Sequence, residues 1–162
     1  MAELTKIEAK LAEVLGLAQA AQGATMKVEK LIDDGQIVRT LARMREEAAE
    51  TERRCVDLAG SLEGRKTAIL EKGRETKSEA KAMMATYLGE DAEGLDGLEF
   101  LTMAEAGEVG HWEILGKLAE RAEDERFRKL AAWATPIQER HLAQVRQGSL
   151  EVAGREDPSE PA

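Results

Sequence analysis

Apolar side chains recur at intervals of three and four from residue 4 to residue 32, and this spacing limits what the chain can fold into. Residues three and four apart share one face of an α-helix. A face that is apolar along its whole length needs a second helix to cover it. The spacing therefore predicts one long helix that belongs to a bundle. The series consists of Leu4, Ile7, Leu11, Val14, Ala18, Ala21, Thr25, Val28 and Ile32.

Two more helical segments follow the first. Residues 33–35, Asp-Asp-Gly, are a short turn signal, so a second helix over about residues 36–60 is expected to fold back antiparallel to the first. A third helix is expected over about residues 65–88. Its middle, residues 71–81, is almost wholly polar, which predicts an extra helix that lies across the surface with little core contact.

The last two helices have recognisable start signals. Residues 96–99, Asp-Gly-Leu-Glu, match a capping box and predict a helix that starts there and ends near residue 122. Asp124 is placed to cap a fifth helix. Pro136 lies within that helix and should kink it, because proline removes one backbone donor. Residues 148–162 are expected to form a flexible acidic tail.

Together these segments predict an all-α chain in which residues 1–147 form one helical domain. No segment has the alternating β-branched pattern of a strand. Residues 3–60 and 98–147 are expected to form two antiparallel hairpins, with the third helix as an extra crossover helix between them. Two hairpins joined by a long crossover are the pattern of a ferritin-like four-helix bundle.

The composition argues against several classes of partner. The chain has 32 acidic and 23 basic side chains and a formal charge of −9, which disfavours nucleic acid and anionic membrane surfaces. No apolar run approaches the roughly 18 residues of a membrane span, and the N-terminus has no signal-like region, so a cytoplasmic location is expected.

The lone Cys55 is expected to be a buried structural thiol. Leu15 and Leu17 widen the apolar stripe of the first helix, which predicts a homodimer.

The candidate chemistry centres on the only two histidines, His111 and His141. Each follows a polar residue by three, Glu108 and Gln138, so each pair shares an apolar helix face on which it could meet a metal ion. If the last two helices are antiparallel neighbours, the histidines are separated by about 10 Å along the axis. They then cannot bind one metal together, and a site that uses His141 would draw on Glu105 or Glu108.

A polar layer can be assembled around His141. In the first hairpin, a turn near residue 34 puts Gln22 level with Glu47 and Gln19 level with Glu50. The layer resembles the ligand set of ferritin-like di-iron bundles, which carry Glu, Glu-x-x-His, Glu and Glu-x-x-His on four successive core helices. Three residues match that pattern by type: Glu47, Glu108 and His141. Three positions carry substitutions: Gln22 for Glu, Glu50 for His and Gln138 for Glu.

A second resemblance covers residues 109–114, Val-Gly-His-Trp-Glu-Ile. They are similar to the Val-Glu-His-Tyr-Glu-Ile segment of a bacterial stress-associated ferritin-like family, with Gly110 in place of a Glu. The resemblances imply an iron or manganese site and a role in stress or metal handling. The ligands would be Glu47, Glu108 and His141, with Glu50, His111 and Gln138 as weaker or supporting groups.

The substitutions leave two functions open. Glutamine offers one neutral carbonyl oxygen and cannot bridge two metal ions as a carboxylate does. The first function is therefore iron or manganese binding at a degenerate carboxylate and histidine site. The second is a non-enzymatic structural or protein-interaction bundle without a physiological metal. In that case both histidines would be hydrogen-bonded core residues, and the glutamates of residues 46–52 would form a solvated helix face.

Overall fold

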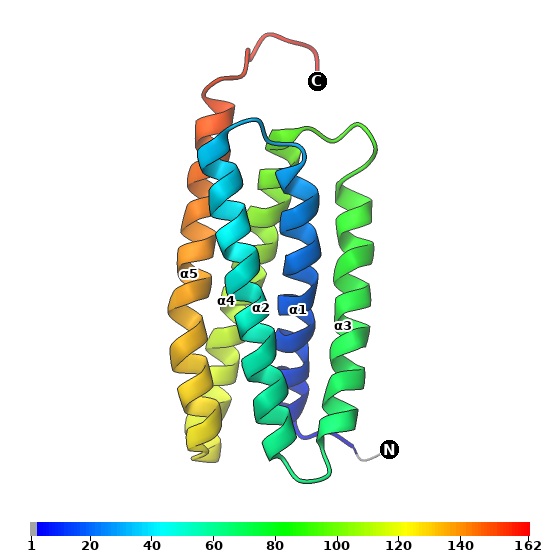
Figure 1. The fold of residues 1–162 in the computed structure, drawn as a ribbon, viewed down its shortest axis with the longest axis vertical. Coiled ribbons are helices and arrows are strands. Elements are labelled where there is room, and N and C mark those ends of the chain that lie inside the picture. Colours follow the sequence, from blue (N-terminus) through cyan, green and yellow to red (C-terminus); the bar gives the residue numbers. More distant parts are fainter. Residues whose placement is uncertain (1–2) are drawn as a thin grey trace.

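The computed structural model describes residues 3–162, and all regular structure in these residues is α-helical, which confirms the predicted all-α class. Successive helices run in opposite directions, so the chain passes up and down the long axis of the molecule (Figure 1). The helices are α1 (Lys6–Glu29), α2 (Gly35–Ser61), α3 (Lys66–Tyr87), α4 (Gly94–Ala122) and α5 (Glu125–Ala153).

Four of these helices form a closed ring of neighbours. α1 packs against α2 and α4, and α5 packs against the same two helices. The two predicted hairpins, α1 with α2 and α4 with α5, are therefore confirmed. α3 lies outside the ring, packed mainly on α1, and leads the chain from the end of α2 back to the start of α4 (Figure 1). Within residues 3–162, no helix combines the length and the apolar character that a membrane crossing requires.

Side-chain caps explain where several helices begin. Asp34 and Asp124 accept backbone N–H groups at the starts of α2 and α5, the second as predicted. The predicted start of α4 at Asp96 was wrong, because the helix begins at Gly94. The Asp96 carboxylate accepts a hydrogen bond from the Glu93 N–H at 2.7 Å. Asp96 thus takes the third position of the first turn, from which an acidic side chain reaches back to the cap.

α5 is longer than the sequence predicted. It continues beyond the expected end at residue 147 to Ala153. Gly148 is buried, and Val152 packs against the apolar core at that end of the bundle. These contacts explain why the last turns stay helical. Pro136 lies inside α5 without ending it.

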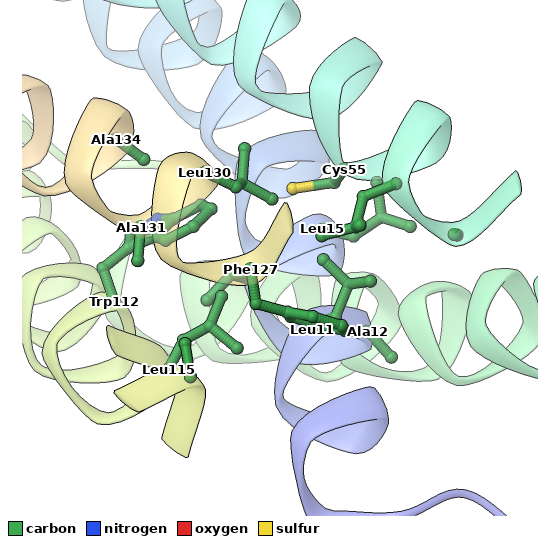
Figure 2. Close-up of a cluster of buried hydrophobic side chains, with 14 of the residues drawn as sticks. Leu11, Ala12, Leu15, Cys55, Trp112, Leu115, Phe127, Leu130, Ala131 and Ala134 are labelled. Carbon is green, nitrogen blue, oxygen red and sulfur yellow. The ribbon is translucent and has the colours of Figure 1, made fainter. Parts of the chain in front are cut away.

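The core consists of two apolar clusters, one towards each end of the bundle. The first gathers the start of α1, the end of α2, the end of α4 and the start of α5, with Leu11, Cys55 and Phe127 among its members (Figure 2). Cys55 is fully buried, as predicted. The second cluster joins the opposite ends of the same helices and includes Val28 and Leu41. The buried polar side chains lie mostly between these clusters, in the middle of the bundle.

α3 lies along α1 instead of across the surface, and the contact depends on two glycines. A Cβ atom built on Gly16 would lie 2.7 Å from the Thr76 Cβ and closer still to the Gly73 carbonyl oxygen, so the two helix backbones approach closely. α3 also covers Leu15, so the apolar stripe is partly buried within the chain. The homodimer stays a prediction. Within residues 71–81 only Gly73 is buried, in keeping with the exposure that the polar run predicted.

Candidate functional site

A layer of buried polar side chains lies midway along the bundle. α4 contributes Glu105 and Glu108, α5 contributes Gln138 and His141, and none of the four is more than 4% exposed. Within each pair the residues are three apart, so both side chains share the face that points into the bundle. Such positions are normally apolar, and polar groups buried there need partners for their atoms.

His141 connects α5 to two other helices. Its Nε2 atom lies 3.3 Å from a carboxylate oxygen of Glu47 on α2. Its Nδ1 atom lies 3.7 Å from a carboxylate oxygen of Glu105 on α4, which is close enough for an ionic contact and too long for a hydrogen bond. The structure therefore brings His141 and Glu47 together, as the predicted polar layer required.

Glu47 also interacts with a cation that the sequence reasoning missed. The Arg140 guanidinium donates a hydrogen bond to the Glu47 oxygen that His141 does not contact. Burial acts to raise the pKa of Glu47, but the hydrogen bonds from Arg140 and His141 outweigh it and hold the pKa below its usual range. On its α2 side, the layer is thus a charge-paired cluster.

Glu105 and Glu108 form the other side of the layer, and they are short of partners. One carboxylate oxygen of Glu105 is buried without a hydrogen bond. Burial and the neighbouring Glu105 carboxyl group raise the pKa of Glu108 well above its ordinary value, and no hydrogen bond acts against this. The side-chain oxygen of Gln138 also lacks a partner. On this side of the layer, one oxygen of Glu105 and one of Gln138 are therefore buried acceptors without a hydrogen bond.

Gln22 and Glu50 lie outside the layer, which corrects the placement expected from a turn near residue 34. The Gln22 amide donates a hydrogen bond to Glu52 at 2.6 Å and does not reach Glu47. Glu50 pairs with arginines one turn along its own helix, Arg53 and Arg54. Glu52 lies more than one turn of α2 beyond Glu47, which was the expected partner of Gln22. Gln22 and Glu50 are both only partly buried, at the edge of the bundle.

His111 lies at the rim of the bundle, which corrects its expected place on an apolar face. Its side chain is 38% exposed. Its Nδ1 atom lies 3.1 Å from the Lys10 ammonium and 3.2 Å from the Glu13 carboxylate, both on α1. Burial and the Lys10 charge lower the pKa of His111 and favour the neutral imidazole, which can accept the hydrogen bond from Lys10. The two histidines do not share a site.

The layer does not fit the donor set of a dinuclear metal centre. Within residues 3–162, no group of three or more His, Cys, Asp or Glu side chains is arranged to hold a metal ion. Bridged metal pairs need several carboxylates. Here the Glu47 carboxylate is already hydrogen-bonded to Arg140, and Gln138 has a neutral amide in place of a carboxylate. Arg140 provides the positive charge that a metal ion would otherwise bring to this part of the layer.

A cavity of about 420 Å³ adjoins the layer between α1, α3 and α4. Glu105 and Glu108 line this cavity, so Glu105 connects it with His141. Mainly apolar walls with a few converging polar groups are typical of small-molecule sites. The apolar part of the lining includes Leu17 and Ala20 from α1, Met83 and Met84 from α3, and Phe100 and Leu101 from α4.

Sequence reasoning found part of this site. Glu105 could be identified from the sequence, because it precedes Glu108 by three residues and so lies on the same helix face. Arg140 was missed, since an arginine beside a histidine gives no signal of its own. The cavity was also missed, because it depends on how α3 lies on α1. Comparisons of the chain with protein-family models, with curated proteins and with solved structures give no match.

Proposed function

We propose that this protein is a ferritin-like bundle that has lost the dinuclear metal centre and serves as a non-enzymatic binding protein for a small molecule. The ring of α1, α2, α5 and α4, with α3 as the connection between the hairpins, supports the ferritin-like part of the proposal. The observation that carries the binding function is the cavity between α1, α3 and α4, which two buried carboxyl groups line.

Iron or manganese binding is the alternative function. Glu47 already interacts with Arg140 and His141, so a metal ion would have to displace a guanidinium before it could bind there. Displacement of a paired cation from a partly buried carboxylate is costly. We therefore expect the protein, purified without a histidine tag, to contain no stoichiometric iron or manganese.

Melting temperature separates the two functions. A metal ion that binds only the folded state stabilises it by mass action, by about 2.7 kcal/mol at a hundredfold excess over its dissociation constant. We expect no shift when Fe(II) or Mn(II) is added. A shift in the parent protein that disappears in His141→Ala and persists in His111→Ala would establish metal binding instead, because only His141 lies in the polar layer.

Binding in the cavity can be measured with Nile red, a neutral apolar dye that fluoresces more strongly outside water. We expect saturable binding to one site per chain. Ala80 on α3 lines the cavity, so the phenyl group of Ala80→Phe should occupy part of it and block the dye. Ala82 lies on the same helix and is exposed, and Ala82→Phe should bind the dye as the parent does. Equal binding by both variants would contradict the proposed site.

A further inference from the structure

The cavity combines an apolar body with an acidic wall. Met84 and Phe100 contribute to the apolar part, and Glu105 and Glu108 contribute the acidic part. The two glutamates are only 2% and 4% exposed. Because they are three residues apart on α4, their carboxyl groups face the same region. A bound molecule would therefore meet both carboxyl groups at one of its ends.

We propose that the cavity takes an amphiphilic cation, with its alkyl chain along the apolar walls and its protonated amine against Glu105 and Glu108. This inference rests on the proposed function, because it names the class of ligand for the same cavity. The oxygen of Glu105 that lacks a hydrogen bond is the one 3.7 Å from His141 Nδ1, so this acceptor is not satisfied within the protein. An ammonium group has three donors and no acceptor, so it can donate to both carboxyl groups at once.

A cation is favoured over other ligands because this wall lacks positive charge. Two adjacent buried carboxyl groups repel each other when both are ionised, and this repulsion adds to the effect of burial on the pKa of Glu108. An ammonium group between them allows both to ionise and forms charge-assisted hydrogen bonds. An anionic ligand would add a further negative charge. A neutral ligand would leave the repulsion unchanged.

The protein's own basic side chains do not fill this role. Three basic residues line the cavity, Lys72, Lys81 and His111. Lys72 pairs with Glu75 on its own helix, Lys81 is exposed to solvent, and His111 contacts Lys10 and Glu13 on α1. His141 lies 3.7 Å from Glu105 and is shared with a carboxylate on α2. Within the described residues, no ion pair joins a lysine or arginine to either carboxyl group of the cavity wall.

Calorimetric titration with octylammonium, octanol and octanoate tests this inference, because the probes share one alkyl chain and differ in charge. We expect octylammonium to bind at least tenfold more tightly than octanol, which corresponds to about 1.4 kcal/mol. Octanoate should bind more weakly than octanol. The formal charge of −9 attracts cations to the protein surface. The preference should therefore also be measured at high salt, which screens exposed charges much more than buried ones.

Two variants locate the charge that produces the preference. Glu108→Gln removes the negative charge with little change in side-chain size, and it should reduce the affinity for octylammonium to that for octanol. Glu105→Gln should weaken octylammonium binding as well. Glu99 lies on the same helix, is exposed and does not line the cavity. Glu99→Gln therefore makes the same change in net charge and should leave both affinities unchanged.

The outcomes distinguish this inference from the proposed function. Equal affinities for octylammonium and octanol in the parent protein, or an unchanged preference in both glutamine variants, would overturn the inference. If octanol still binds and Ala80→Phe still blocks it, the cavity binds small molecules and only the ligand class is wrong. If neither Nile red nor any octyl probe binds, the proposed function fails together with the inference.

Discussion

Gly16→Ala should loosen α3, because Gly16 lies where α3 touches α1 and these helices form two of the three walls of the cavity. A Cβ atom at this position would lie 2.7 Å from the Thr76 Cβ and 3.0 Å from the Lys77 backbone nitrogen, whereas ordinary contacts begin at 3.4 Å. Backbone and Cβ atoms cannot rotate away as a side-chain end can. α3 must therefore move by at least about 0.7 Å to relieve the Thr76 contact, and by more to relieve the Gly73 carbonyl oxygen, which lies closer still.

Gly23→Ala is the matched control, since it lies on the same helix and no atom is within 4 Å of a Cβ built there. Both substitutions gain about 1 kcal/mol of helix propensity. Only Gly16→Ala adds the cost of overpacking, which is typically about 1–3 kcal/mol. We expect Gly23→Ala to be about 1 kcal/mol more stable than the parent. Gly16→Ala should be less stable than Gly23→Ala by about 1–3 kcal/mol.

Urea unfolding monitored by circular dichroism measures this difference directly. Melting temperatures should differ by about 2–4 °C for each kcal/mol in a chain of this length. Nile red binding should weaken in Gly16→Ala and stay unchanged in Gly23→Ala, because only the first substitution displaces a wall of the cavity. Equal stability of the two variants would refute the reasoning, since α3 would then not depend on the close approach at Gly16.

Three further predictions concern pH, dynamics and reactivity. Because the folded state raises the pKa of Glu108 above 4.5, the unfolded chain releases this proton first, and the parent loses stability as pH rises from about 4.5 towards the raised pKa. Thermal melts should therefore show that the stability of Glu108→Gln increases relative to that of the parent as the pH rises above about 4.5, and a difference that does not vary with pH would contradict this. Amide hydrogen exchange should be faster in residues 71–81 than in residues 100–120, because Gly73 is the only buried residue of the first segment, and equal protection would show that α3 is held more firmly than its contacts indicate. Burial raises the pKa of the Cys55 thiol, so a thiol reagent should label Cys55 only as the protein unfolds, and rapid labelling of the native protein would show that α2 opens locally.

The antiparallel pairing of α4 with α5 was predictable from the sequence. A site that uses His141 was expected to draw on Glu105 or Glu108, and Glu105 lies 3.7 Å from His141. The link between the two helices is tight, because α4 ends at a residue in the left-handed conformation, Glu123 with φ 53°, and Asp124 then caps the next helix. A link this short leaves little freedom to shift one helix along the other.

The pairing of polar groups between α1 and α2 was not predictable in the same way. Gln22 was expected beside Glu47 and instead contacts Glu52. Gln19 donates to the same carboxylate at 3.0 Å. Long polar side chains reach diagonally across a helix interface, so a register counted from the turn does not identify their partners. Those partners depend on how the two helices pack.

The sequence by itself determined the five helices, the two hairpins and the presence of polar groups midway along the bundle. Apolar spacing, caps and turns act over a few residues, so they can be recognised without knowledge of the rest of the chain. Only the tertiary structure decided that Arg140 pairs with Glu47 and that Gly16 lets α3 approach α1. These contacts join residues far apart in the chain, and the cavity exists only because three helices pack at the distances that such contacts allow.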